Sequence, residues 1–206
     1  MVYAVITGDI IGSTKIDPTS RSIIIRDWLQ QALWKYHFEL SRGDTFQLEV
    51  PLADALRISI DIRVVLKSQL ASKHYRPDAC ISIGLGSISF RDSTIATSTG
   101  TAFEFSGRGL EKLKGQFSQI QLFSEHSEIN SACNTCLALL EWAIQHWSSS
   151  QATAIHYMLH EQTQQAIASI ERVSQSAIQQ RLKAAGWPAV EILLKYYNET
   201  IKQLRI

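Results

Sequence analysis

The sequence predicts an α+β fold: an antiparallel β-sheet with helices packed on one face, followed by a small all-α domain. Two observations support this prediction. Apolar segments with strand and helix periodicity alternate as β-α-β-β-α-β, then α-β, which is the split β-α-β or ferredoxin-like order. From about residue 125 onward, every apolar segment instead has helical spacing.

The strands are indicated by β-branched runs and by alternation of apolar and polar residues. Residues 2–8 (VYAVITG) are apolar and rich in β-branched side chains, so they predict the first strand. Residues 36–50 alternate on both sides of a Gly-Asp pair, which is typical of a β-hairpin. Residues 80–88 and 117–123 predict the two remaining strands.

Three helices are expected between these strands. Apolar residues of segment 19–35 recur at helical spacing. Pro51 occupies a favoured first helical position, and the apolar residues after it continue at helical spacing. Residues 100–114 predict the third helix. Gly84 and Gly86 in the fourth strand form no phosphate-loop pattern, so we interpret them as sites of close backbone approach.

The last part of the chain has the outline of a helix-turn-helix. Residues 163–170 predict a short helix and 171–173 a turn, and Ser174 is a natural N-cap for a second helix that ends at Gly186. A glycine with positive φ is usual in such a turn, but Arg172 stands there, at a cost of about 1 kcal/mol. The alternative is a three-helix interaction module that does not bind DNA.

The second helix of this outline would turn a polar face outward. Gln pairs with adenine, Ser accepts several base edges, and Lys and Arg contact phosphates, so this face suits DNA. The candidate DNA-binding residues are Arg172, Gln175, Ser176, Gln179 and Lys183.

A final helix is expected at 189–204. It carries an apolar stripe that suits either homodimerisation or covering of the small domain, made of Ile192, Leu193, Tyr196, Tyr197 and Ile201. Together, these patterns predict a sheet domain at 1–125, a helical linker at 126–150 and a helix-turn-helix domain at 151–206.

Bulk composition limits the function classes. A length of 206 residues suffices for a large core domain with a small second one. The formal net charge of +1 excludes general basicity as an argument for nucleic-acid binding, but it leaves room for a local basic face. Three cysteines and the lack of a secretion-signal pattern predict a cytoplasmic protein, and no apolar run is long enough to span a membrane.

Two aspartates are the first candidates for chemistry. Asp9 ends the predicted first strand and Asp44 lies in the hairpin turn, and the split β-α-β order places these positions side by side. Two carboxylates that close repel each other unless a cation lies between them, and hard oxygen ligands suit Mg²⁺ or Mn²⁺. The alternative is that each aspartate caps nearby backbone N–H groups, and the residue pattern alone favours neither interpretation.

Four motifs occur in a recognisable order within residues 3–123. They are GDIIGST (8–14), SRGDTFQLE (41–49), ISIGLGSI (81–88) and GTAFEFSGRGLEKLK (100–114). In these motifs the chain resembles the SatD family and, through it, the palm domain of class III nucleotidyl cyclases. The resemblance favours the metal interpretation of the two aspartates.

The resemblance also implies roles for single residues. Asp9 and Asp44 correspond to the metal carboxylates, and the backbone carbonyl of Ile10 to a further ligand. Arg108 occupies the place of the arginine that stabilises the transition state. The turn that follows Ile10 would hold phosphate oxygens through its N–H groups, at Gly12, Ser13 and Thr14.

Other residues bear on the same site. Lys112 and Lys114 end the helix that carries Arg108 and could reach phosphates, although lysines are common at helix C-termini for electrostatic reasons. The family asparagine four positions before the arginine corresponds to Glu104, and the purine-reading lysine to Leu40. Both departures count against a cyclisation reaction.

The remaining candidates are weaker. Cys133 and Cys136 have the spacing of a zinc pair but no second pair follows, so we interpret them as structural. His156 and His160 are four residues apart and share a helix face, but they have no carboxylate or cysteine partner at a recognisable spacing. We interpret them as packing or solvent-facing residues.

Two functions of different class therefore follow from the sequence. The first is a DNA-binding regulator in which a cyclase-like palm binds a nucleotide with Mg²⁺ or Mn²⁺. The second is an active nucleotidyl cyclase or nucleotidyltransferase that releases pyrophosphate with the help of two metal ions.

Overall fold

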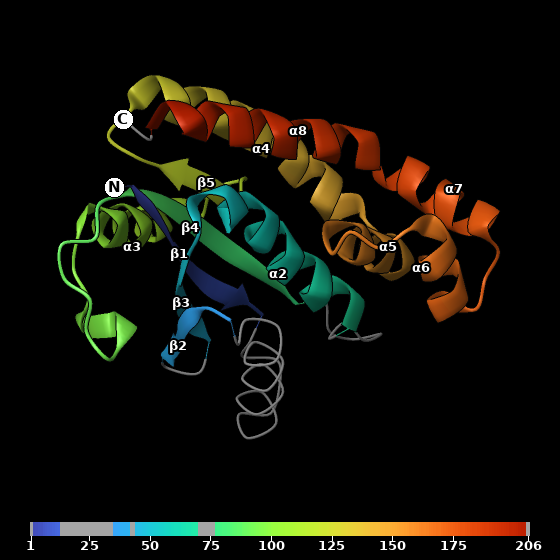
Figure 1. Ribbon diagram of the computed structural model, residues 1–206, viewed down its shortest axis with the longest axis horizontal. Coiled ribbons are helices and arrows are strands. Elements are labelled where there is room, and N and C mark those ends of the chain that lie inside the picture. Colours follow the sequence, from blue (N-terminus) through green and yellow to red (C-terminus); the bar gives the residue numbers. More distant parts are fainter. Residues whose placement is uncertain (1, 13–34, 42–43, 70–76, 205–206) are drawn as a thin grey trace.

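The computed structural model describes residues 2–12, 35–41, 44–69 and 77–204. It is an α+β structure with one five-stranded mixed sheet and, within the described residues, seven α-helices (Figure 1). The strands are β1 (Tyr3–Ile11), β2 (His37–Ser41), β3 (Thr45–Val50), β4 (Asp78–Gly86) and β5 (Ile120–Phe123). The helices are α2 (Ala55–Gln69), α3 (Thr101–Leu113), α4 (Ser127–His146), α5 (Ser149–Leu159), α6 (Gln164–Glu171), α7 (Gln175–Ala185) and α8 (Trp187–Ile201).

Within the described residues, the predicted order of strands and helices is confirmed, with shifted boundaries. Strands β2 and β3 form the predicted antiparallel hairpin, and a short 3-10 turn follows Pro51 before α2 begins. Strand β1 continues to Ile11, so Asp9 lies inside the strand rather than at its end. The helix predicted at 19–35 lies almost entirely outside the described residues.

The prediction of a purely antiparallel sheet is wrong. The strand order is β2-β3-β1-β4-β5, and β5 pairs with β4 in the parallel direction. The physical reason is the connection: α3 lies between β4 and β5 in the chain, and a helical crossover returns the next strand in the same direction.

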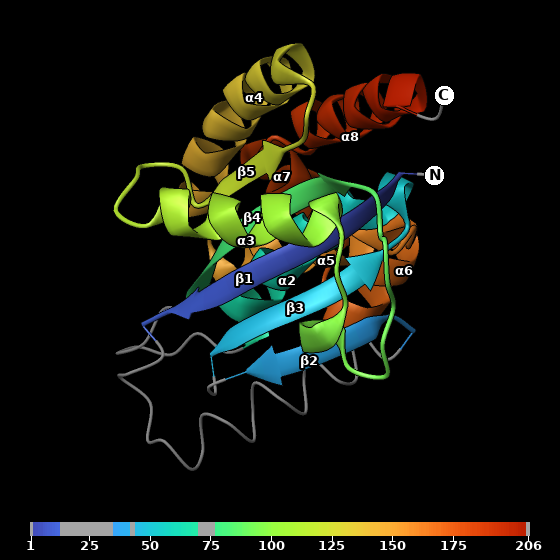
Figure 2. The same cartoon turned by 90° about the vertical axis from the view of Figure 1, so that its left-hand side faces the viewer.

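The prediction that helices cover only one face is also wrong. Alternation along β4 directs Ile81 and Ile83 into the main core with α2, whereas Ser82 and Gly84 face α3 on the opposite side. Figure 2 shows α3 in front of the sheet and α2 behind it. The face that carries α3 also carries the side chain of Thr7, whose hydroxyl donates to Ser106 Oγ at 2.9 Å. Asp9 is two residues further along β1 and shares this face.

The predicted close approach at Gly84 and Gly86 is confirmed. A Cβ at Gly84 would lie 2.2 Å from the carbonyl oxygen of Ala102 and 2.4 Å from the nitrogen of Ser106. A Cβ at Gly86 would lie 2.6 Å from the nitrogen of Ala102. The two glycines therefore allow the backbone of α3 to rest directly on β4.

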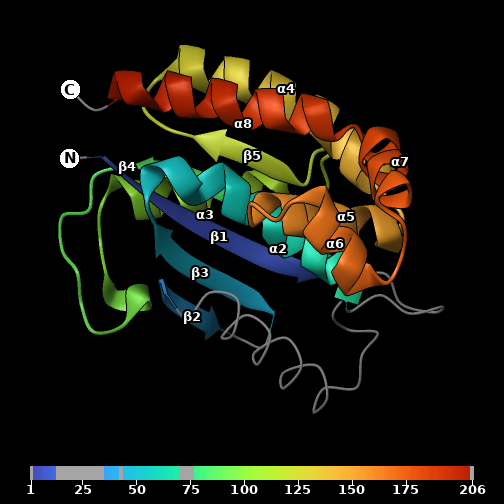
Figure 3. The same ribbon diagram turned by 45° about the vertical axis from the view of Figure 1, so that its right-hand side comes forward.

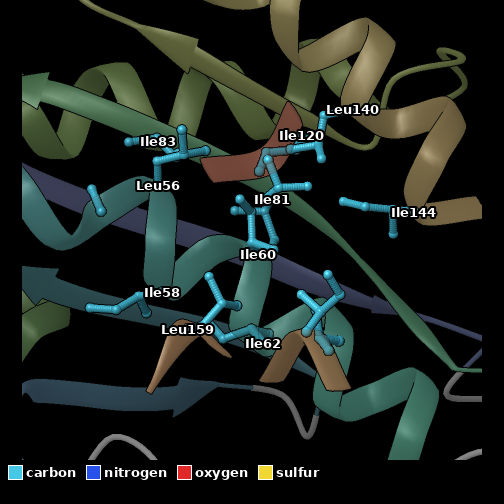
Figure 4. Close-up of a cluster of buried hydrophobic side chains, with 14 of the residues drawn as sticks. Leu56, Ile58, Ile60, Ile62, Ile81, Ile83, Ile120, Leu140, Ile144 and Leu159 are labelled. Carbon is cyan, nitrogen blue, oxygen red and sulfur yellow. The ribbon is translucent and has the colours of Figure 1, made fainter. Parts of the chain in front are cut away.

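One continuous cluster of buried apolar side chains runs from the sheet through α2 into the C-terminal helices. Figure 4 shows this cluster, with Ile60 and Ile62 of α2 among side chains of β4, β5, α4 and α5. At the other end of the cluster, the buried hydroxyl of Tyr197 donates to the carbonyl of Leu52 at 2.8 Å and fixes α8 against the segment before α2. None of the described helices combines the length and apolar character needed to cross a bilayer.

A buried ion network holds the same elements together. The side chain of Arg63 is fully buried, and its guanidinium contacts Asp78 at 2.7 and 2.8 Å and Glu141 at 2.6 and 2.9 Å. Although burial opposes ionisation of Asp78, the charge of Arg63 holds the pKa of that carboxyl below its usual value. Glu141 also accepts from the backbone nitrogen of Gln119 at 2.9 Å, so α2, α4 and the starts of β4 and β5 meet at one arginine.

We expect Gly84→Ala to lower the free energy of unfolding by about 1–3 kcal/mol or more, because the added methyl collides with helix backbone rather than with a movable side chain. Gly107→Ala is the matched control, since nothing lies within 4 Å of its Cβ position. It should stabilise α3 by about 1 kcal/mol. Urea unfolding followed by circular dichroism measures both, and equal effects of the two substitutions would contradict the packing described for α3.

Candidate functional site

Asp9 and Asp44 come together at one end of the β1–β3 pair. The backbone nitrogen of Ile10 donates to the carbonyl of Asp44 at 3.0 Å, and the register pairs Asp9 with Thr45. The hydroxyl of Thr45 lies 3.4 Å from a carboxylate oxygen of Asp9. Two residues that are far apart in the sequence therefore become neighbours, as the split β-α-β order predicts.

The electrostatics of Asp9 fit a cation site. Partial burial and, next, the negative charge of Asp44 raise the pKa of Asp9 above its usual value. The positive charge of Lys114 and the hydrogen bond from Thr45 act in the opposite direction but do not cancel the shift. A divalent ion between the two carboxylates would relieve this repulsion, and the hard oxygen donors suit Mg²⁺ or Mn²⁺.

The other predicted residues near this pair lie at the end of α3 and directly after β1. Lys114, at the end of α3, is close enough to Asp9 for its positive charge to oppose the rise in the pKa of that carboxyl. Lys112 lies on the side of α3 that faces β5, with its ammonium 5.9 Å from the ring centre of Phe123. Gly12, directly after β1, has a φ of 78°, in the left-handed region that favours glycine.

Arg108 is not directed at the carboxylate pair. Its side chain is 75% exposed on the face of α3 opposite the buried residues, and it pairs with Glu104 at 3.4 Å. Glu104 thus offsets part of the positive charge of Arg108. The predicted positions Ser13 and Thr14 lie outside the described residues.

The second candidate site is formed by α6, α7 and the turn between them. Helix α6 is capped by Thr163 and α7 by Ser174, each side-chain oxygen accepting from a backbone nitrogen three residues later. Between them Arg172 adopts the left-handed conformation, with φ 55° and ψ 44°. The turn conformation predicted for Arg172 is confirmed, although glycine would adopt it with less strain.

The outer face of α7 is polar. Ile178 and Leu182 point into the core, and Val173 and Ala177 are half-buried. The residues predicted to face outward are all exposed: Arg172, Gln175, Ser176, Gln179 and Lys183. Nearby, Arg181 of α7 pairs with Glu171 of α6 at 3.2 Å.

The predicted apolar stripe of α8 is split between two faces. Tyr197 and Ile201 are buried in the core, which corresponds to the covering role. Ile192 is 69% exposed and Tyr196 38% exposed, so this side of α8 remains uncovered in a single chain. The neighbouring helix α4 likewise exposes Leu139 and Trp142 (Figure 1).

A third cluster was missed by the sequence analysis. His156 and His160 meet a carboxylate after all, because Asp61 of α2 lies against the same face of α5. Spacing along the chain gives no signal for this contact, since it joins separate helices. Cys133 is buried in the core, in agreement with a structural role.

Comparisons with protein-family models, with curated proteins and with solved structures return no match.

The raised pKa of Asp9 predicts a specific pH dependence in metal-free buffer. Because the folded protein holds this proton more tightly than the unfolded chain, the free energy of unfolding falls as the pH rises from the usual value of 3.8 through the folded pKa. Asp9→Asn removes this loss, so the variant should be more stable than the wild type at neutral pH. The difference in free energy of unfolding between Asp9→Asn and the wild type should vanish below pH 3.8.

Urea unfolding across this pH range, with a chelator present, measures the effect. Asp92→Asn is the control of opposite sign, because a backbone hydrogen bond from Ser93 lowers the pKa of Asp92. That substitution should destabilise the protein at neutral pH and have no effect at low pH. If the free energy of unfolding of Asp9→Asn follows that of the wild type at all pH values, the repulsion between Asp9 and Asp44 is contradicted.

Proposed function

We propose that the protein is a cytoplasmic regulator that binds DNA through α6 and α7 and binds a nucleotide with Mg²⁺ or Mn²⁺ at a cyclase-like palm. The observation that carries the proposal is the turn between these helices, where Arg172 ends α6 in the left-handed conformation and Ser174 caps α7, with the polar face of α7 left in solvent. Second helices of this kind read base edges in the major groove.

The chemistry of the exposed residues supports DNA as the partner. Gln175 and Gln179 lie one turn apart and offer amides for adenine, and Lys183 continues the same face with a positive charge. Arg172 stands at the turn, where its side chain is exposed and can meet a phosphate. A homodimer through the uncovered side chains of α4 and α8 would present two such faces to consecutive half-sites.

The palm supports nucleotide binding more than catalysis. Asp9, Asp44 and the carbonyl of Ile10 would hold the ion, and Lys114 would add a charge for phosphate oxygens. Mg²⁺ or Mn²⁺, when bound, would neutralise phosphate charge. The partial pairing of Arg108 with Glu104 withdraws the group on which transition-state stabilisation would depend.

DNA binding is tested with duplexes selected from a random library and with one unselected duplex. We expect Gln179→Ala to weaken binding to the selected sequence by about 1–3 kcal/mol and to change the unselected duplex little. Lys183→Ala should weaken both and reduce the slope of log affinity against log salt by about one.

The matched controls for these variants are Lys195→Ala on α8 and Gln203→Ala near the C-terminus, both exposed residues of the same types. They should bind as the wild type does. Fluorescence anisotropy at several salt concentrations measures all four. The DNA proposal is rejected if the wild type shows no salt-dependent binding, or if the α7 variants behave like the controls.

The second candidate is an active nucleotidyl cyclase or nucleotidyltransferase, and the convergence of Asp9 and Asp44 favours it. Incubation with each of the four nucleotides and Mn²⁺ should then yield pyrophosphate, detected by chromatography, and Asp44→Ala should abolish it. For the regulator we expect no product, but a rise in melting temperature with nucleotide and Mn²⁺ that Asp44→Ala removes. If neither a product nor a thermal shift is observed, both candidate functions of the palm are rejected.

A further inference from the structure

His156 of α5, His160 at the C-cap of α5 and Asp61 of α2 form a compact cluster. The ring nitrogen Nδ1 of His156 lies 2.6 Å from Oδ1 of Asp61, and Nε2 of His160 lies 2.8 Å from Oδ2. One oxygen or nitrogen atom from each of the three residues lies within 4.8 Å of the others. The histidines are one helical turn apart, so both rings project from the same face of α5, and Figure 3 shows α5 alongside α2.

The cluster is enclosed on one side and open on the other. The Asp61 side chain is 13% exposed, that of His156 22% and that of His160 45%. An ion could therefore enter past His160, while the carboxylate that holds it remains mostly shielded from water. This shielding strengthens the attraction between the carboxylate and a cation.

The donor set selects the kind of ion. Two imidazoles and one carboxylate suit borderline transition metals such as Zn²⁺, whereas Mg²⁺ and Ca²⁺ prefer oxygen ligands alone. Zinc lies about 2.0–2.2 Å from nitrogen and oxygen ligands, so tetrahedral donors stand roughly 3.4 Å apart. The present separations of 2.6 and 2.8 Å mean that these donors need to spread by roughly 0.6–0.8 Å.

A metal ion has to compete with protons at this cluster. Both ring nitrogens that face Asp61 donate to it in the metal-free protein, because a carboxylate only accepts. A bound cation takes the place of these two hydrogens: in a neutral imidazole the proton moves to the other ring nitrogen, and an imidazolium releases one proton to water. The positive charges of Arg57 and Lys35 act on His160 and would repel a cation there. Arg57 is paired with Asp54 at 2.9 Å, which offsets part of its charge.

We propose that Asp61, His156 and His160 form a zinc site that joins α5 to α2, with water as the fourth ligand on the exposed side. Such a site cross-links the C-terminal helices to the helix that underlies the sheet. It stands apart from Asp9 and Asp44 in ligand chemistry, and it does not depend on whether the protein binds DNA or nucleotide.

The test uses the full chain after treatment with a chelator. Titration with Zn²⁺ should show one equivalent bound and a raised melting temperature, and Co²⁺ should give a visible spectrum without a thiolate charge-transfer band. His160→Gln keeps an N–H donor for Asp61 but removes the imidazole. Since loss of an outer partner alone weakens metal affinity about 10–100-fold, this variant should bind at least about tenfold more weakly.

The matched control is His146→Gln, an exposed histidine of α4 whose ring contacts the carbonyl of Trp142. It should bind zinc as the wild type does. A second measurement needs no variant: zinc should shift the ¹⁵N resonances of His156 Nδ1 and His160 Nε2 in the wild-type protein. The proposal is overturned by failure to bind zinc, by equal affinity in His160→Gln, by unshifted imidazoles, or by a thiolate band that Cys136→Ser removes.

Discussion

The fully buried guanidinium of Arg63 is the constraint on which the arrangement of the molecule depends. It lies where α2, β4, the residue before β5 and α4 meet, and each of its three nitrogens has a carboxylate oxygen within hydrogen-bond distance. A charge enclosed in this way is tolerated only while both carboxylates are in place, since loss of one partner costs about 3–5 kcal/mol. The position of α4 relative to the sheet is therefore specified, rather than merely allowed by apolar packing.

Helix α2 transmits this constraint to the candidate sites. One of its faces packs on the sheet beneath β1 and β4, and another receives α5, which in turn packs against α7. Ion pairs and apolar contacts thus connect the strand that carries Asp9 with the helix that exposes Gln179. A shift of α2 would therefore alter the packing at both ends.

Local patterns predicted local structure well. The cap at Ser174 and the left-handed turn at Arg172 follow from backbone chemistry within a few residues. Pairings that join distant parts of the chain had no such signal. The parallel direction of β5, the partners of Arg63 and the approach of Asp61 to the α5 histidines depend on tertiary packing, which residue spacing does not record.

The left-handed conformation of Arg172 sets a limit on how far this protein can be stabilised without changing its surface. Glycine at this position would relieve about 1 kcal/mol of backbone strain, and no hydrogen bond of the turn requires the arginine side chain. A chain optimised only for folding would carry glycine here. Arginine at this position therefore exchanges backbone stability for a positive charge at the edge of α7.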